Sequence, residues 1–147
     1  GVSLGHDVKY ATPKGYEPNP DVVKRAVEIA AGSGASITGT NDPIEAVTGA
    51  GVIYTDVFVS MGEESMEGKF ADFDGFQVNE DLVSHAHPNY LFMHCLPAHR
   101  GEEVTDGVVD SANSVVFDQA ENRMWAQMSL LTMMCNRAAW DTYLELS

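Results

Sequence analysis

Two apolar runs decide how this chain is expected to fold: GVIYTDVFV at residues 51–59 and YLFMHC at residues 90–95. Both are short and rich in β-branched and aromatic residues, which is typical of strands buried on both faces of a parallel sheet. Similar runs predict strands at 7–12, 36–40 and 114–117, with a weaker one near 76–78. Because helical stretches separate them, the pattern predicts an α/β fold with a doubly wound, mostly parallel sheet.

Three capping side chains stand where helices are expected to begin: Asn19, Asp42 and Asn79. Proline follows the first two at the first helical position, which strengthens both start signals. These three helices are expected to end near Gly34, Gly49 and Ala86. The longest helix is expected from Asp118 to about Tyr143, and its sequence is apolar over more than one face. Such a helix usually packs on something beyond its own core.

Composition excludes several classes of protein. The 147 residues suit a single domain, and 22 acidic against 8 basic side chains give a formal net charge of −14. This balance argues against a nucleic-acid or anionic-membrane partner, and we attribute the acidic excess first to surface solvation. No apolar run is long enough for a membrane span, and two cysteines do not make a disulfide framework. We expect a cytoplasmic protein.

Asp56 falls inside the first apolar run, near the carboxyl end of its predicted strand. An ionised carboxylate there is costly unless a cation or several hydrogen-bond donors accompany it. One interpretation is an aspartate that forms a turn or caps a helix, which is the commoner case for such a segment. The other is a carboxylate that receives a cationic amine, because ligands of parallel sheets bind at the carboxyl ends of the strands.

His94, Cys95, Leu96 and Pro97 end the second apolar run. Pro97 cannot continue a ladder and is expected to hold Leu96 extended, which leaves Cys95 and the Leu96 carbonyl at the mouth of the crevice. A lone cysteine is most often a small buried hydrophobe. The adjacent imidazole favours a functional thiol, since a nearby cation or hydrogen-bond donor lowers the pKa of a cysteine.

Other ligand chemistries have little support in the sequence. The histidines and cysteines show neither C-x-x-C nor H-x-x-x-H spacing, and neither glycine-rich nucleotide motif occurs. We therefore expect no metal site and no organic cofactor. Arg123, one turn into the last predicted helix, has two interpretations: a surface salt bridge, or a guanidinium that meets a phosphate or carbonyl oxygen.

Four blocks in the right order resemble ornithine carbamoyltransferase: ATPKGYEP at 11–18, TDVFVSMGEE at 55–64, FMHCLPAHRGEEVTD at 92–106 and VVFDQAENRMWAQ at 115–127. Together they look like the second half of that enzyme. The resemblance implies that residues 1–147 are a Rossmann-like domain, truncated at its N-terminus, that binds L-ornithine. It also implies a further domain that holds most of the carbamoyl phosphate site, and a homotrimer in which the active sites form.

On the ornithine side, the resemblance implies roles for Asp56 and for the loop that follows it. Asp56 resembles the carboxylate that receives the α-amino group of ornithine. Ser60 and Met61, followed by Gly62, resemble the mobile S-M-G loop that closes over the amino acid. This agrees with the interpretation of Asp56 as a carboxylate that receives an amine.

On the reacting side, Cys95 resembles the cysteine that positions and deprotonates the δ-amino nucleophile. Cys95 and Leu96 also resemble residues that touch the carbamoyl group, and Arg123 resembles the arginine at the carbamoyl oxygen. His94 and Pro97 are expected to shape the site. The implied chemistry is acyl transfer, in which a neutral amine attacks carbamoyl phosphate to give citrulline and phosphate, a step of arginine metabolism.

The sequence departs from the family in what it lacks. The S-T-R-T-R phosphate loop, the H-P-x-Q segment and the D-G-N-N strand are absent. An acidic chain whose one candidate ligand cation is Arg123 is poorly equipped to hold the carbamoyl phosphate anion alone. We therefore expect the ornithine-binding half of an ornithine carbamoyltransferase, inactive as the isolated chain. The alternatives are a non-catalytic amino-acid-binding or assembly module, and a transcarbamylase of other amine specificity.

Overall fold

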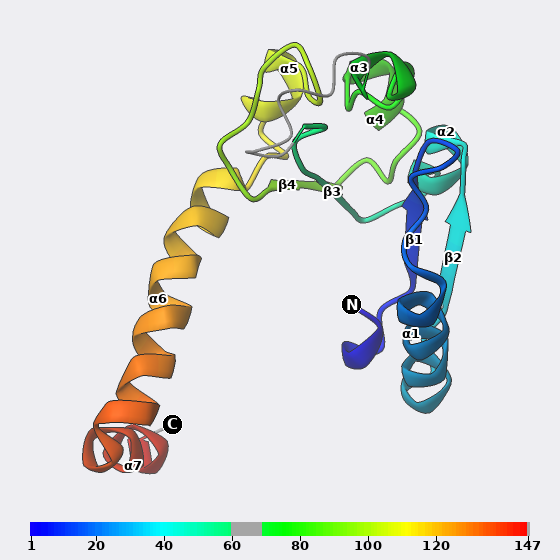
Figure 1. The fold of residues 1–147 in the computed structure, drawn as a ribbon. Helices are drawn as coiled ribbons and strands as arrows, with labels where there is room; N and C mark the ends of the chain where they lie inside the picture. The colour runs from blue at the N-terminus through cyan, green and yellow to red at the C-terminus, as the bar shows by residue number, and fades with distance from the viewer. Residues whose placement is uncertain (60–68, 147) are drawn as a thin grey trace.

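The computed structural model describes residues 1–59 and 69–146, and within them two parallel strand pairs form the sheet layer (Figure 1). β1 (Val8–Ala11) pairs with β2 (Ile37–Thr40), and β3 (Val52–Thr55) pairs with β4 (Leu91–His94). These four predicted strands and the α/β class are confirmed. In the described residues the strands form two separate two-stranded sheets.

The helices lie toward two opposite sides of the strands. Figure 1 shows α2 (Pro43–Val47), α4 (Glu80–Val83) and α5 (Asp106–Val109) on one side, and α1 (Pro20–Ser33) and α6 (Val116–Cys135) extending toward the other. A 3₁₀ turn at Val2–Leu4, α3 (Lys69–Asp72) and α7 (Arg137–Leu146) complete the described elements. This two-sided arrangement is the one expected of a doubly wound fold.

The three predicted helix starts are confirmed by the capping bonds. The Asn19 side chain accepts from the Asp21 amide, and the Asp42 side chain accepts from the amides at the start of α2. The Asn79 side chain accepts from the Leu82 amide. Each bond satisfies a main-chain donor that the first turn of a helix leaves without a partner. The first helix ends at Gly34, whose φ of 76° lies in the left-handed region that glycine adopts without strain.

The hydrophobic core lies against one face of β3 and β4. Ile53 and Phe92 project into it and meet side chains from α2, α4 and α5, of which Val108 is 1% exposed. Side chains alternate along a strand, so the neighbours of these residues project from the opposite face. On that face Val52, Tyr54 and Leu91 are 54%, 55% and 44% exposed. One face of this strand pair is therefore packed, and the other is largely open.

The predicted strand at 114–117 is wrong. A single bridge joins Ser114 to Phe92, and α6 begins at Val116. Val116 is almost fully buried, so this apolar segment anchors the first turn of a helix on the core. The weaker strand near 76–78 is likewise reduced to one bridge, between Val78 and Val104. Apolar runs of this length do not distinguish a strand from a buried helix start.

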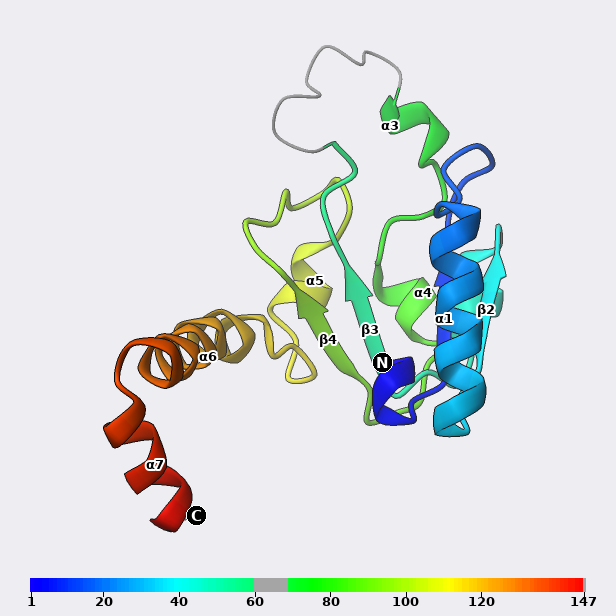
Figure 2. The same ribbon diagram turned by 60° about the horizontal axis from the view of Figure 1, so that its bottom comes forward.

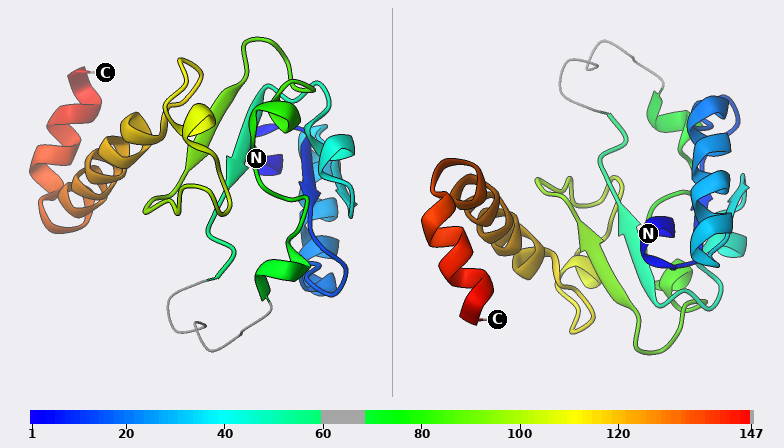
Figure 3. Two further views of the ribbon diagram at one scale, coloured as in Figure 1. Left: turned by 90° about the horizontal axis from the view of Figure 1, so that it is seen from above. Right: turned by 90° about the horizontal axis from the view of Figure 1, so that it is seen from below.

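The single long helix predicted over 118–143 is also wrong. α6 ends at Cys135, Asn136 leaves the helical conformation with φ −136° and ψ 76°, and α7 follows in a new direction (Figures 2 and 3). Figure 2 shows α6 standing clear of the strands. Its large apolar side chains are accordingly exposed: Met124, Trp125, Met128, Leu130, Leu131, Met133 and Met134. None of the described helices combines the length and hydropathy needed to cross a bilayer.

Candidate functional site

The register of β3 and β4 brings two predicted site residues together. Thr55 and His94 are partners at the carboxyl ends of these parallel strands. The residues that directly follow these two in the chain are therefore Asp56, after β3, and Cys95, after β4. Both lie just beyond the strands, where the chain is released from the ladder and side chains can turn toward a ligand.

Asp56 and Cys95 are joined directly. The Cys95 thiol donates to Asp56 Oδ1 at a Sγ–Oδ1 distance of 2.9 Å, and the Val57 amide donates to the same oxygen at 2.7 Å. The thiol donor, together with that amide, holds the pKa of Asp56 below its usual range, although partial burial opposes this. Asp56 is thus an ionised carboxylate on an exposed residue, with donors in place but no cation at it in the described residues.

The pKa of Cys95 is opposite to the predicted direction. Burial raises the pKa of the thiol, and the bond to the Asp56 carboxylate raises it further. The neighbouring imidazole does not lower it, because the His94 side chain points away into the core, where it is 1% exposed. Cys95 is therefore a protonated hydrogen-bond donor in this state. A thiolate there requires that Asp56 first finds another partner.

His94 is held from both ring nitrogens. The Leu96 amide donates to Nδ1 at 2.9 Å, so Nδ1 is the acceptor and Nε2 carries the proton. His94 Nε2 lies 3.2 Å from Oε1 of Glu103, whose side chain is completely buried. The His99 amide donates to the same Oε1 at 2.7 Å. This network ties the chain on either side of Cys95 to the core, so its physical effect is to fix where the thiol sits.

The backbone at Leu96 differs from the prediction. Its φ is 54°, in the left-handed region, rather than extended, and the Leu96-Pro97 peptide bond is cis. A left-handed leucine is strained, and here the Leu96 amide gains the His94 Nδ1 acceptor while its side chain packs against the core. The chain thereby turns sharply away from the sheet directly after Cys95, which leaves the thiol at the strand end.

A hollow opens beside Asp56. It is lined by the ends of β1 and β3, including Thr55 and Asp56, and by aromatic side chains from the segments that follow. Phe58 and Phe73 stack there with ring centroids 4.6 Å apart. A carboxylate at the edge of an aromatic wall suits a small molecule that carries both an ammonium group and a methylene chain.

The remaining predicted site residues are not brought to this pair. Arg123 lies exposed on α6, and within the described ranges no hydrogen bond or ion pair joins it to Asp56 or Cys95. Ser60, Met61 and Gly62 lie outside the described residues. The structure therefore brings Asp56 and Cys95 together, and the roles of this pair, of the loop and of Arg123 all stay predictions.

Sequence reasoning missed two side chains that organise the site. Glu103 holds the His94 ring through a hydrogen bond at Nε2. Gln119 Oε1 of α6 accepts a hydrogen bond from the His94 amide at 3.1 Å, and this bond ties the start of α6 to the end of β4. In the sequence, Glu103 looks the same as its neighbour Glu102, although one is buried and the other exposed. Only the partly apolar surroundings of Glu103, next to Val104, could have hinted at this difference.

One group of side chains has the composition of a metal site. Ligand atoms of His99, Glu102 and Glu103 lie within 4.8 Å of one another. Oε1 of Glu103 is already engaged by His94 and His99, and the other two residues are exposed. We therefore treat the group as part of the network that supports His94.

Comparison with known proteins assigns the chain to a family. The family model described as the Asp/Orn binding domain of aspartate/ornithine carbamoyltransferase matches residues 1–134. The chain belongs to the aspartate/ornithine carbamoyltransferase family. The Asp56 and Cys95 pair lies within the matched domain, and the resemblance found in the sequence is thereby confirmed.

Individual relatives within this family are similar over most of the chain. An anabolic ornithine carbamoyltransferase of Pyrococcus furiosus is 58% identical over 135 residues, which cover 91% of this chain and 43% of the relative. A catabolic one of Thermoplasma acidophilum is 59% identical over 129 residues, 87% of this chain and 42% of the relative. The solved structure of the Pyrococcus furiosus enzyme superimposes with a TM-score of 0.85 at 59% identity, over 89% of this chain and 42% of that one. The chain thus spans less than half the length of these relatives.

Proposed function

We propose that this chain is the ornithine-binding half of an ornithine carbamoyltransferase, which transfers the carbamoyl group of carbamoyl phosphate to the δ-amino group of L-ornithine and releases citrulline and phosphate. The observation that carries the proposal is the Asp56–Cys95 pair at the carboxyl ends of β3 and β4, beside an aromatic hollow. High identity to relatives named for this activity supports it.

Asp56 is the proposed acceptor for the α-ammonium group of ornithine. It is ionised, and the Val57 amide holds it although the residue is exposed, so its orientation is set before the ligand arrives. An ammonium group that bonded Oδ1 would compete with the Cys95 thiol, since Oδ1 already accepts from that thiol and from the Val57 amide. A charge-assisted hydrogen bond of this kind is about twice as strong as one between neutral groups.

Cys95 is the proposed contact for the reacting end of ornithine. Released from Asp56, the thiol loses the hydrogen bond and the negative charge that raise its pKa. It then becomes available to position the δ-amine and to take part in removing its proton, which the amine must lose to act as a nucleophile. Binding of ornithine and preparation of Cys95 would in this way be one event.

Other parts of the reaction fall to groups outside this pair. We assign the carbamoyl oxygen to Arg123 with Leu96 nearby, and closure over ornithine to the loop with Ser60, Met61 and Gly62. Carbamoyl phosphate is an anion and needs a cationic site, which we assign to a further domain of the kind that the longer relatives contain. We place the working enzyme in the cytoplasm as a homotrimer with no nucleic-acid or membrane partner.

One experiment distinguishes the proposal from its two alternatives, a transcarbamylase of other amine specificity and a non-catalytic binding module. A chimera carries residues 1–134 of this chain in place of the matched region of the Pyrococcus furiosus relative, and is assayed with ornithine, putrescine and N-acetylornithine. The proposal predicts citrulline from ornithine as the preferred reaction. Preference for another amine would support a transcarbamylase of other specificity. Ornithine binding by a folded chimera without turnover would support a non-catalytic binding module.

A further inference from the structure

The chain returns along the outer edge of β4, the edge that faces away from β3, just before α6 begins. The Phe92 amide donates to the Asn113 carbonyl at 2.8 Å, and the Phe92 carbonyl accepts from the Val115 amide at 3.0 Å. These two bonds make one parallel bridge, between Phe92 and Ser114. If this parallel ladder continued, the His94 amide would next donate to the Val115 carbonyl.

Gln119 supplies a partner to each of these two main-chain groups. Its own amide donates to the Val115 carbonyl at 2.9 Å, which is the first hydrogen bond of α6. Its side-chain oxygen, Oε1, accepts from the His94 amide at 3.1 Å, in the place that the Val115 carbonyl would have taken. Gln119 therefore begins the helix where the ladder ends, and the His94 amide still has an acceptor.

This junction determines how α6 leaves the strands. Val115, at the N-cap position, makes no side-chain capping bond, so contacts with β4 and the core hold the first turn instead. Val116 is 1% exposed and Gln119 is partly buried, whereas Trp125 is already 51% exposed. The direction of α6 is therefore set at its first turn, by Val116 in the core and by Gln119 at the end of β4.

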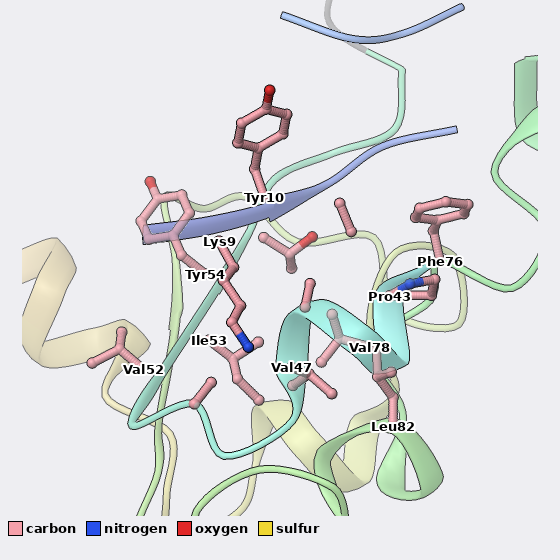
Figure 4. Close-up of a pocket in the computed structure, with 14 residues that line it drawn as sticks. Lys9, Tyr10, Pro43, Val47, Val52, Ile53, Tyr54, Phe76, Val78 and Leu82 are labelled. Atoms are coloured by element: carbon pink, nitrogen blue, oxygen red, sulfur yellow. The ribbon is translucent and has the colours of Figure 1, made fainter. Parts of the chain in front are cut away.

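The Gln119 side chain also reaches the open face of β3. Figure 4, which looks into the groove between β1 and β3, shows Ile53 on the core side of β3 and Tyr54 on the other side. Partial burial and the nearby Cys95 raise the pKa of Tyr54, and a hydrogen bond with the Gln119 side chain opposes this rise. Gln119 thus contacts β4 directly before Cys95 and β3 two residues before Asp56.

Arg123 lies one helical turn beyond Gln119. Residues four apart share a face of an α-helix, so Arg123 lies on the face that Gln119 turns toward β4. At a rise of about 1.5 Å per residue, the two residues stand about 6 Å apart along the helix axis. A tilt of about 10° at the first turn would move Arg123 by about 1 Å, and a misplacement of that size can cost about a hundredfold in rate.

We propose that Gln119 is a positioning residue for carbamoyl transfer: by holding the first turn of α6 at the carboxyl end of β4, it sets where Arg123 stands relative to Cys95. The inference rests on the proposed function, in which Arg123 contacts the carbamoyl oxygen and Cys95 contacts the δ-amine. Gln119 itself touches neither substrate. It contributes to the rate and not to the affinity for ornithine, whose ammonium group is held at Asp56.

The chimera described above provides the kinetic test. Gln119→Met keeps the length of the side chain but offers no oxygen to the His94 amide; it should lower kcat at least about tenfold and leave KM for ornithine within about threefold. Gln119→Glu keeps an oxygen acceptor and should hold kcat within about threefold of wild type. Gln127→Met makes the same change at an exposed position of α6, two turns further on, and should leave both constants unchanged.

A double-mutant cycle with Arg123→Met separates positioning from a general loss of folding. If Gln119 acts through Arg123, Gln119→Met should lower kcat less than about threefold once the guanidinium is gone. An equal loss with and without Arg123 would overturn the proposal, as would a Gln119→Glu variant as slow as Gln119→Met. A wild-type chimera that forms no citrulline would overturn the proposed function, and the inference with it.

The contact between Gln119 and β4 is measured in the whole chain, independently of turnover. Hydrogen exchange of the His94 amide, followed by NMR, should be at least about tenfold faster in Gln119→Met than in wild type and close to wild type in Gln119→Glu. The Phe92 amide, whose acceptor is the Asn113 carbonyl, is the internal control and should exchange at the wild-type rate in both variants. Unchanged exchange at His94, or equally faster exchange at both amides, would contradict the role given to Gln119.

Discussion

Asp56 and Cys95 lie side by side because Thr55 and His94 are paired in register one residue earlier. Their proximity could be predicted from the sequence, since two apolar runs with polar residues at their carboxyl ends belong on neighbouring parallel strands. The chemical state of Cys95 could not. It depends on the burial of the thiol and on its bond to Asp56, whereas the His94 imidazole points into the core toward Glu103, nine residues further along the chain.

The state of Cys95 gives a prediction for thiol labelling. A raised pKa in the folded chain means that the protonated thiol is favoured, so its bond to Asp56 stabilises the fold below the unfolded pKa of about 8.5 and is lost as pH rises through the folded pKa. The alkylation rate of Cys95 by iodoacetamide should therefore rise at higher pH than that of a model thiol. Asp56→Asn should move the profile to lower pH.

Mass spectrometry of the two cysteine-containing peptides measures Cys95 and Cys135 separately, so Cys135, which is exposed, reports any change in the reagent itself. Asp21→Asn, at an exposed carboxylate of α1, is the matched control and should leave the Cys95 profile in place. If the alkylation rate of Cys95 had the same pH dependence in wild type and in Asp56→Asn, the Asp56 carboxylate would not be what raises the pKa of the thiol.

Asp56→Asn should also weaken ornithine binding in the chimera by about 1.5 to 3 kcal/mol, the range for a hydrogen bond to a charged group. The amide keeps the shape of the side chain but not its charge. Affinity for carbamoyl phosphate should change little. Titration calorimetry with each ligand separates the two effects, and equal ornithine affinity in variant and wild type would remove Asp56 from the site.

Glu103 provides a prediction about stability. Glu103→Gln keeps one acceptor but buries an amide NH₂ at the position of Oε2, which has no hydrogen-bond partner in the described structure and lies 4.0 Å from His99 Nδ1. The free energy of unfolding in urea should fall by about 1 to 3 kcal/mol, as for a buried group left unsatisfied. Glu102→Gln changes the exposed neighbour and should stay within about 0.5 kcal/mol of wild type. Equal losses in the two variants would contradict the role given to burial.

At the scale of elements, local signals predicted the structure where a local interaction decides it. The three helix starts were predictable because each is capped by a side chain that bonds an amide two or three residues further along the chain. Residues 114–117 were not, because Val116 is buried by contacts with distant core residues and serves a helix there. The break at Asn136 was not predictable either, since the apolar pattern continues on both sides of it.

The exposed side of α6 gives a prediction about association. Contiguous apolar surface of this kind is rare on monomers, so the isolated chain should self-associate in sedimentation velocity as its concentration rises. Replacing Leu131 and Met134, which are 59% and 71% exposed, by glutamine should shift the distribution toward monomer. Leu4→Gln alters a leucine outside α6 that is 79% exposed, and it should leave the distribution unchanged. If the wild-type chain stayed monomeric at all concentrations, the exposed side of α6 would not drive self-association.

At the scale of the whole molecule, the fold class and the position of the candidate site followed from the sequence, whereas the division of the sheet into two pairs did not. Each strand was recognisable from its own residues. The groove between β1 and β3 depends on which strands become neighbours, and that is a long-range property. The acidic balance of the chain agrees with our proposal that carbamoyl phosphate is held by a further domain.

The most direct test is citrulline formation by the purified chain, alone and mixed with a separately produced carbamoyl-phosphate-binding domain of the Pyrococcus furiosus relative. The account predicts no measurable citrulline from the chain alone and citrulline from the mixture, with the rate reduced by Asp56→Asn and unaffected by Asp21→Asn. Citrulline formed by the chain alone would contradict it, as would a mixture whose rate is the same with Asp56 and with asparagine in its place.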